Sequence, residues 1–175
     1  MVLVNVNGKD TVDASNLLMV LDAESFNPTA AKNDNRYISL TRTEKRNGNT
    51  IRLKTKTFLV NNDNIVFGIQ LTPQTFVKKY YESCLQFGHE TNGLIKVSNT
   101  DYYMLPNILY LTEELSKTQR EEYLRLERLN RVFTLGRKTK SFMLVEGGKD
   151  RFMIKSPFAR STIITHIREL YRKER

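Results

Sequence analysis

The dipeptide Asn47-Gly48 constrains the fold of this chain more than any other feature of its sequence. Asn-Gly favours the two-residue turn of a β-hairpin, because both residues adopt positive φ angles readily. The segments on either side of it, 36–46 and 50–60, alternate apolar with polar residues, which is the period of a strand. A second turn over 61–64 leads into another apolar segment. The sequence therefore predicts a three-stranded antiparallel meander over residues 37–71.

One side of this predicted meander is basic. Arg52, Lys54 and Lys56 alternate with other residues, and no acid interrupts them. Exposed lysines on a strand discourage pairing between sheet edges, whereas an uninterrupted cationic side can also bind a polyanion. The sequence leaves both interpretations open. The turn predicts three cross-strand pairs, Arg52 with Thr43, Lys54 with Thr41 and Lys56 with Ser39, and an apolar side made of Ile38, Leu40, Ile51, Leu53 and Leu59.

Helix signals are spread over the rest of the chain. A Thr-Pro start and a glycine end predict a helix over 72–88, and a brief apolar run predicts a short helix over 13–26. The longest helix is expected to begin at Thr112 or Thr118 and to end at Gly136. A last helix is expected to follow Ser156-Pro157.

Strand pairs are predicted between these helices. Alternating valines predict a strand or hairpin at the start of the chain, and further hairpins are expected over 93–105 and 141–155. Turn residues over 27–36 predict a loop. The mixed order predicts an α+β fold, in which the meander and further short hairpins pack with three to four helices. No internal repeat is apparent.

The length of the chain predicts one domain. At 175 residues, of which 39% are hydrophobic, the chain is long enough for a core of its own. The alternative is a β-rich half over 1–71 and a helical and hairpin half over 72–175 that carries a basic C-terminal segment. No 18 apolar residues run together, and the start lacks a signal-peptide pattern. We therefore expect no membrane partner and a cytoplasmic or virion location.

Positive charge is concentrated in the last quarter of the chain. The net charge is +9, and residues 131–175 contain twelve cations against four acids. Such asymmetry is typical of a region that faces a polyanion, although an evenly solvated surface is the other interpretation. The residues predicted to contact nucleic acid or an acidic partner are Arg137, Lys138, Lys140, Lys149, Arg151 and Lys155, together with Arg52, Lys54 and Lys56.

The predicted last helix has an apolar side beside a basic one. Ile163, Ile167 and Leu170 recur at helical spacing, and Arg168 and Arg172 lie next to them. A helix of this kind can dock on a protein partner through its apolar side while the arginines stay exposed. We therefore predict that these five residues form an interaction helix.

Residue types that carry chemistry are sparse. His89 and His166 have no second ligand at metal-binding spacing, and Cys84 lies in the apolar stripe of a predicted helix, where a small buried hydrophobe is expected. The sequence therefore predicts no metal, no cofactor and no enzyme. A catalytic site assembled only by the tertiary structure stays open.

Two functions fit these observations. The first is a non-enzymatic structural subunit of a larger homo- or hetero-oligomeric assembly, such as a component of a phage or virus particle that packs near nucleic acid. The alternative is a basic DNA- or RNA-binding regulatory protein that makes non-specific phosphate contacts through the 137–155 loop and hairpin.

Overall fold

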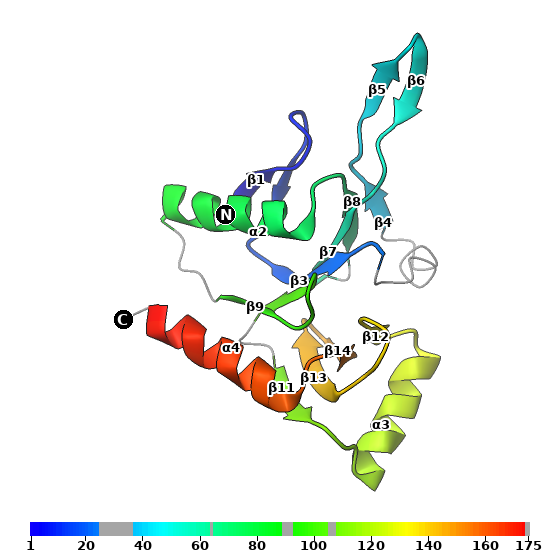
Figure 1. Ribbon diagram of the computed structural model, residues 1–175, viewed down its shortest axis with the longest axis vertical. Helices are drawn as coiled ribbons and strands as arrows, with labels where there is room; N and C mark the ends of the chain where they lie inside the picture. The colour runs from blue at the N-terminus through cyan, green and yellow to red at the C-terminus, as the bar shows by residue number, and fades with distance from the viewer. Residues whose placement is uncertain (25–36, 64, 89–92, 105–107, 174–175) are drawn as a thin grey trace. The chain divides into compact units, whose positions relative to one another are not determined.

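The chain has the α+β fold that its sequence predicts (Figure 1). The computed structural model describes residues 1–24, 37–63, 65–88, 93–104 and 108–173. The loop predicted over 27–36 lies outside the described residues.

The chain divides into two compact units, Met1–Thr91 and Asn92–Arg175, which we call unit 1 and unit 2. The alternative boundary considered from the sequence, between residues 71 and 72, falls inside unit 1, between its last strand and its helix.

In its described residues, unit 1 has four neighbouring strands of a sheet, two hairpins and one helix. The four strands have the order β4-β8-β7-β3. Helix α2 (Pro73–Gln86) confirms the predicted helix, and the Thr72 side chain caps it by accepting a hydrogen bond from the Thr75 amide. The strands are β1 (Leu3–Asn5), β2 (Thr11–Asp13), β3 (Leu17–Asp22), β4 (Tyr37–Ser39), β5 (Thr43–Arg46), β6 (Asn49–Arg52), β7 (Thr57–Asn61) and β8 (Val66–Ile69).

The short helix predicted over 13–26 is wrong, because the chain forms strand β3 there. Residues 17–21, Leu-Leu-Met-Val-Leu, are all buried. A short apolar run buried on both faces fits a strand inside a sheet as well as a buried helix, and periodicity alone does not separate the two.

The predicted meander is correct in part. Strands β7 and β8 pair antiparallel, but β4 pairs parallel with β8, and β5 and β6 form a separate two-stranded ribbon. The predicted pair Thr43–Arg52 is confirmed. The other two pairs are wrong, because Ser39 pairs with Gly68 of β8 and the ribbon ladder ends at Thr43 and Arg52. Ile38 and Ile51 of the predicted apolar side are exposed.

The described residues of unit 2 form a hairpin, a four-stranded sheet and two helices. The hairpins predicted over 93–105 and 141–155 are confirmed for the described residues, which end at 104 in the first of them. The sheet has the order β11-β13-β14-β12. The elements are β9 (Leu94–Lys96), β10 (Tyr102–Met104), β11 (Ile108–Thr112), α3 (Lys117–Arg128), β12 (Val132–Thr134), β13 (Ser141–Gly147), β14 (Asp150–Ser156) and α4 (Arg160–Lys173).

The long helix predicted up to Gly136 is shorter in the structure. Neither predicted cap is used, because Ser116 and Gln119 form the capping box at its start. Arg128 is its last residue, and the apolar residues that follow form β12. Phe133, predicted on the helix, is instead buried in this strand, which pairs parallel with β14.

The two units repeat one topology, which the sequence analysis did not detect. Each begins with an antiparallel hairpin, β1-β2 or β9-β10. Each sheet then has the same order and the same strand directions: an outer parallel strand, the two strands of a hairpin, and a fourth strand that is antiparallel to its neighbour. Each unit ends with a 14-residue helix, α2 or α4.

The strand registers coincide residue by residue. The ladder β3-β7 has an irregularity between Leu17 and Met19, and the ladder β11-β13 has one at the same place, between Ile108 and Tyr110. Each terminal helix begins at the fourth residue after its preceding strand. A shared bulge is a specific feature of a fold, and this one indicates that the units are two copies of one module.

Candidate nucleic-acid interface

Two of the basic segments singled out in the sequence occupy the same position in the two modules. Residues 54–56 and residues 138–140 both read Lys-Thr-Lys, and we call them the Lys-Thr-Lys segments. The first leads into β7 and the second into β13, which are equivalent strands. The structure therefore relates two predicted contact regions that lie far apart in the sequence.

The same hydrogen bonds hold both segments. The Lys56 amide donates to the Ile69 carbonyl oxygen, and the Lys140 amide donates to the Ser156 carbonyl oxygen, each at 2.8 Å. The residue after each segment, Thr57 or Ser141, is fully buried. Each of these hydroxyls donates to a backbone carbonyl two residues beyond the end of the partner strand, Leu71 at 2.6 Å and Phe158 at 2.7 Å.

The lysine side chains of both segments are exposed. In each segment the two lysines face solvent and the threonine between them is half-buried. None of the four ammonium groups forms an ion pair with a carboxylate in the part of the chain that the structure describes. Each segment thus presents two positive charges on a backbone that the sheet holds in place.

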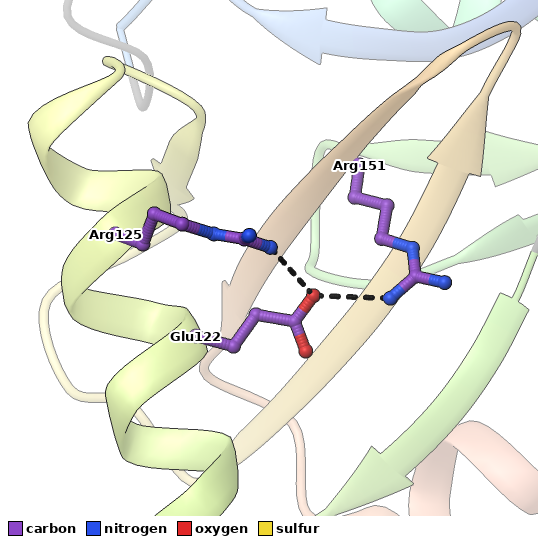
Figure 2. Close-up of polar contacts among 3 residues, drawn as sticks. All are labelled: Glu122, Arg125 and Arg151. Carbon is purple, nitrogen blue, oxygen red and sulfur yellow. Dashed lines mark hydrogen bonds and ion pairs between the residues drawn. The ribbon is translucent and has the colours of Figure 1, made fainter.

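The remaining basic residues predicted around the second segment differ in how free they are. Arg137 and Lys149 are exposed. Arg151 is not free, because its guanidinium lies 3.2 Å from Glu122 of α3, which also binds Arg125 (Figure 2). Lys155 is half-buried, with its ammonium 5.6 Å from the centre of the Tyr123 ring. Both residues therefore contact α3, and the carboxylate of Glu122 offsets the charge that Arg151 offers to a ligand.

The predicted interaction helix is α4. Ile163 is fully buried, and Ile167 and Leu170 are half-buried. Leu170 lies directly against Gly93, the residue before β9, and leaves no room there for a side chain. This part of the helix therefore packs within its own unit. Arg168 and Arg172 are exposed. A partner that approaches α4 would therefore meet the arginines and not Ile163.

The one cysteine has the environment of a core residue. Cys84 lies in α2 and is buried. Burial raises the pKa of its thiol, because the thiolate loses the solvation it has in water. The thiolate is the nucleophilic form, so Cys84 is a poor nucleophile at neutral pH.

Cys84 is expected to resist thiol reagents while the protein is folded. Burial blocks access to the thiol, and its raised pKa lowers the fraction of thiolate. Mass spectrometry after treatment with iodoacetamide at neutral pH measures the labelling. The same treatment in urea is the control and should label the thiol fully. Labelling of the folded protein at the rate of the unfolded chain would show that the thiol is accessible.

The described residues hold no group of three or more His, Cys, Asp or Glu side chains that could bind a metal ion. No helix among the same residues is long and apolar enough to cross a membrane. No protein-family model, curated protein or solved structure matches the chain.

Sequence reasoning found the lysines but missed how they are related. The signal was present, because Lys-Thr-Lys-Thr-Phe at 54–58 and Lys-Thr-Lys-Ser-Phe at 138–142 differ at one position. A five-residue match is too short to indicate a repeat by itself. It becomes informative once the sheet registers place both copies at the start of equivalent strands.

Proposed function

We propose that this chain is a non-enzymatic nucleic-acid-binding protein that contacts the phosphate backbone through the two Lys-Thr-Lys segments. The observation that carries this proposal is that the same basic segment, with the same exposure and backbone hydrogen bonds, recurs at the equivalent place in both modules. Charges that serve only solubility need no fixed place in a fold, whereas a repeated ligand contact does.

Phosphate is the chemistry that best fits these segments. An ammonium group is a compact charge that binds phosphate oxygens without demanding one geometry. The hydroxyl of the intervening threonine, Thr55 or Thr139, is a further donor of the kind that proteins use toward phosphates. Contacts of this kind position a protein on nucleic acid without reading its sequence, so the binding should be non-specific.

The test is the salt dependence of binding to a short fluorescent DNA duplex, measured by anisotropy. Affinity falls as salt rises, so the slope of log affinity against log salt is negative, and each lysine that neutralises a phosphate makes it steeper by about 0.9. Replacing Lys54 and Lys56 with glutamine should therefore make the slope shallower by about 1.8. Replacing Lys138 and Lys140 should make it shallower by a similar amount, because the two segments are equivalent.

The matched control is a variant in which Lys78 and Lys117 are changed to glutamine. Both lysines are exposed, and one lies in each unit, so the control removes the same charge from elsewhere on the surface. Its slope should stay close to that of the wild type. Absence of binding by the wild type at low salt, or equal slopes in all three variants, would contradict the proposal.

A subunit of a larger assembly is a second candidate function. Its support is the exposure of large apolar side chains on the helices: Leu85 at the end of α2 is 84% exposed, and Leu129 at the end of α3 is 52% exposed. Large apolar side chains left exposed at the end of a helix are available for contact with a partner subunit. Sedimentation at micromolar concentration tests this function. A large closed particle supports it, and a monomer at every concentration contradicts it.

A further inference from the structure

The ribbon β5-β6 is present in unit 1 and has no counterpart among the described residues of unit 2. In unit 1, residues 41–53 lie between Leu40 and the first Lys-Thr-Lys segment. In unit 2, only residues 136–137 lie between the equivalent residue, Leu135, and the second segment. The two leucines are equivalent because each follows the last residue of a parallel strand and makes the same hydrogen bond. The Leu40 amide donates to the Gly68 carbonyl oxygen, and the Leu135 amide donates to the Lys155 carbonyl oxygen. The ribbon is therefore an insertion into one copy of the module.

The ribbon has no core of its own. Every residue from 42 to 52 is exposed, including Ile51 at 44%. The two strands meet in a two-residue turn, with positive φ angles of 51° at Asn47 and 78° at Gly48, and Figure 1 shows them extending away from β4 and β8 of the same unit. An isolated two-stranded hairpin is marginally stable in water, so its folding stability does not account for its presence.

The base of the ribbon is fixed to unit 1. The Arg42 guanidinium donates to the Asn7 carbonyl oxygen at 3.0 Å, and its amide donates to the Gln70 side chain at 3.0 Å. The Asn7 side chain in turn donates to the Leu40 carbonyl oxygen at 2.7 Å. These bonds tie the start of the insertion to the β1-β2 turn, so the ribbon is held where it leaves the sheet while its tip is free to contact a ligand.

The two faces of the ribbon differ in charge. Residues that pair across the strands point to the same side. One face has the pairs Thr43–Arg52 and Lys45–Thr50, which give two cations, two hydroxyls and no acid. The other face has Glu44 and Arg46, which bind each other at 3.0 Å. We call the first of these the cationic face. Neither of its cations has an ion-pair partner among the described residues.

We propose that the β5-β6 ribbon is an arm that inserts its cationic face into the major groove of duplex DNA; this inference rests on the proposed function and names the form of nucleic acid that is bound. A two-stranded antiparallel ribbon fits the major groove of B-form DNA, and ribbons that enter a groove are an established mode of DNA binding. Lys45 and Arg52 supply the charge for the phosphates that line the groove. The threonines supply hydroxyls for phosphate oxygens and base edges.

A-form RNA is a poor ligand for such an arm, because its major groove is deep and narrow. Single strands have no groove to receive a ribbon. Duplex DNA should therefore gain affinity from the ribbon, and duplex RNA and single strands should not. All three ligands should still bind the Lys-Thr-Lys segments through their phosphates.

Unit 2 provides the design for a variant without the ribbon. Replacing residues 41–53 with Gly-Arg joins Leu40 to Lys54 by the connection that unit 2 uses between Leu135 and Lys138. The glycine is kept because Gly136 has a φ of +68°. This variant should bind duplex DNA on the order of tenfold more weakly at 0.1 M salt, and its affinity for duplex RNA and for single-stranded DNA should change little.

Point variants test the face without removing the ribbon. Replacing Lys45 and Arg52 with glutamine should make the salt slope on duplex DNA shallower by about 1.8. Replacing Glu44 and Arg46 with glutamine leaves the net charge unchanged and alters the opposite face, so its slope should match that of the wild type. Methyl green, a major-groove ligand, should compete with the wild type more strongly than netropsin, which occupies the minor groove.

The outcomes separate this inference from the proposed function. No binding of the wild type to any nucleic acid overturns both. Binding of duplex DNA with the same affinity and slope by the wild type, the ribbonless variant and the Lys45 and Arg52 variant overturns the arm alone. An equal loss on duplex RNA and duplex DNA also overturns it, because it would show charge without preference for the groove.

Discussion

Leu59→Ala and Met143→Ala are each expected to lower the free energy of unfolding by about 2–5 kcal/mol. The two residues occupy the same position in the two modules, since Leu59 pairs with Val20 and Met143 pairs with the equivalent residue Leu111. Leu59 is 1% exposed and Met143 is 0% exposed. Each truncation removes buried apolar atoms and leaves a cavity that the surrounding sheet fills only in part. Urea denaturation followed by circular dichroism measures both effects.

The control for these substitutions lies in the same segments. Lys56→Ala and Lys140→Ala change exposed side chains close to the same strands, so each should alter stability by no more than about 0.5 kcal/mol. A large loss for one core residue and none for the other would show that the two modules, despite their common topology, do not place equivalent residues in equivalent cores.

Local turn and cap chemistry was the part of the fold that the sequence predicted well. Asn47-Gly48 turns the ribbon, Gly148 lies in the turn of the hairpin β13-β14 with a φ of +61°, and Thr72 caps α2. Each of these signals acts between residues that are a few positions apart, so a single sequence contains all the information.

The strands that form only because a sheet buries them could not be predicted from the sequence. The run that forms β3 and the run Ile-Leu-Tyr-Leu-Thr that forms β11 are short and apolar, and only the sheet around them makes them strands. The parallel pairs β4-β8 and β12-β14 join segments that are distant in the sequence. No local residue pattern specifies such a pairing.

The repeat was not predicted from the sequence, because equivalent positions in the two modules are buried alike but often hold different residues. Phe76 of α2 and Ile163 of α4 occupy equivalent places and are both fully buried, yet they are different residues. Asp10 and Asp101 are identical and close the same kind of turn, in which the Val6 and Val97 amides donate to their carbonyl oxygens at 3.0 Å. Scattered identities of this kind become visible only when the registers align them.

The candidate site was predicted by charge and corrected by tertiary contacts. Lys54, Lys56, Lys138 and Lys140 were found because their surroundings in the sequence lack acids. Arg151 and Lys155 were selected by the same criterion, but both contact α3. Glu122 forms an ion pair with Arg151, and the Tyr123 ring lies beside the Lys155 ammonium group. Those partners lie about thirty positions away in the sequence, so charge counting over short windows overlooked them.

Thr57→Val and Ser141→Ala are expected to cost about 1–3 kcal/mol each, because each removes a hydroxyl of a fully buried residue that donates to a backbone carbonyl. Both hydroxyls are fully buried and donate to equivalent carbonyls, of Leu71 and Phe158. These bonds join the start of β7 or β13 to the segment that leads into the terminal helix. Urea denaturation of both variants measures the cost.

Thr57→Ser is the control that separates the hydrogen bond from packing. It keeps the hydroxyl and removes one methyl group, so it should cost only about 0.8 kcal/mol. If Thr57→Val were as stable as the wild type, the hydroxyl would contribute nothing and the shared geometry would be incidental. A larger cost for the valine variant, matched by Ser141→Ala in unit 2, would show that both modules use one bond to fix the backbone beside their Lys-Thr-Lys segments. The bond would then explain why the two segments have the same exposure in units whose sequences otherwise differ.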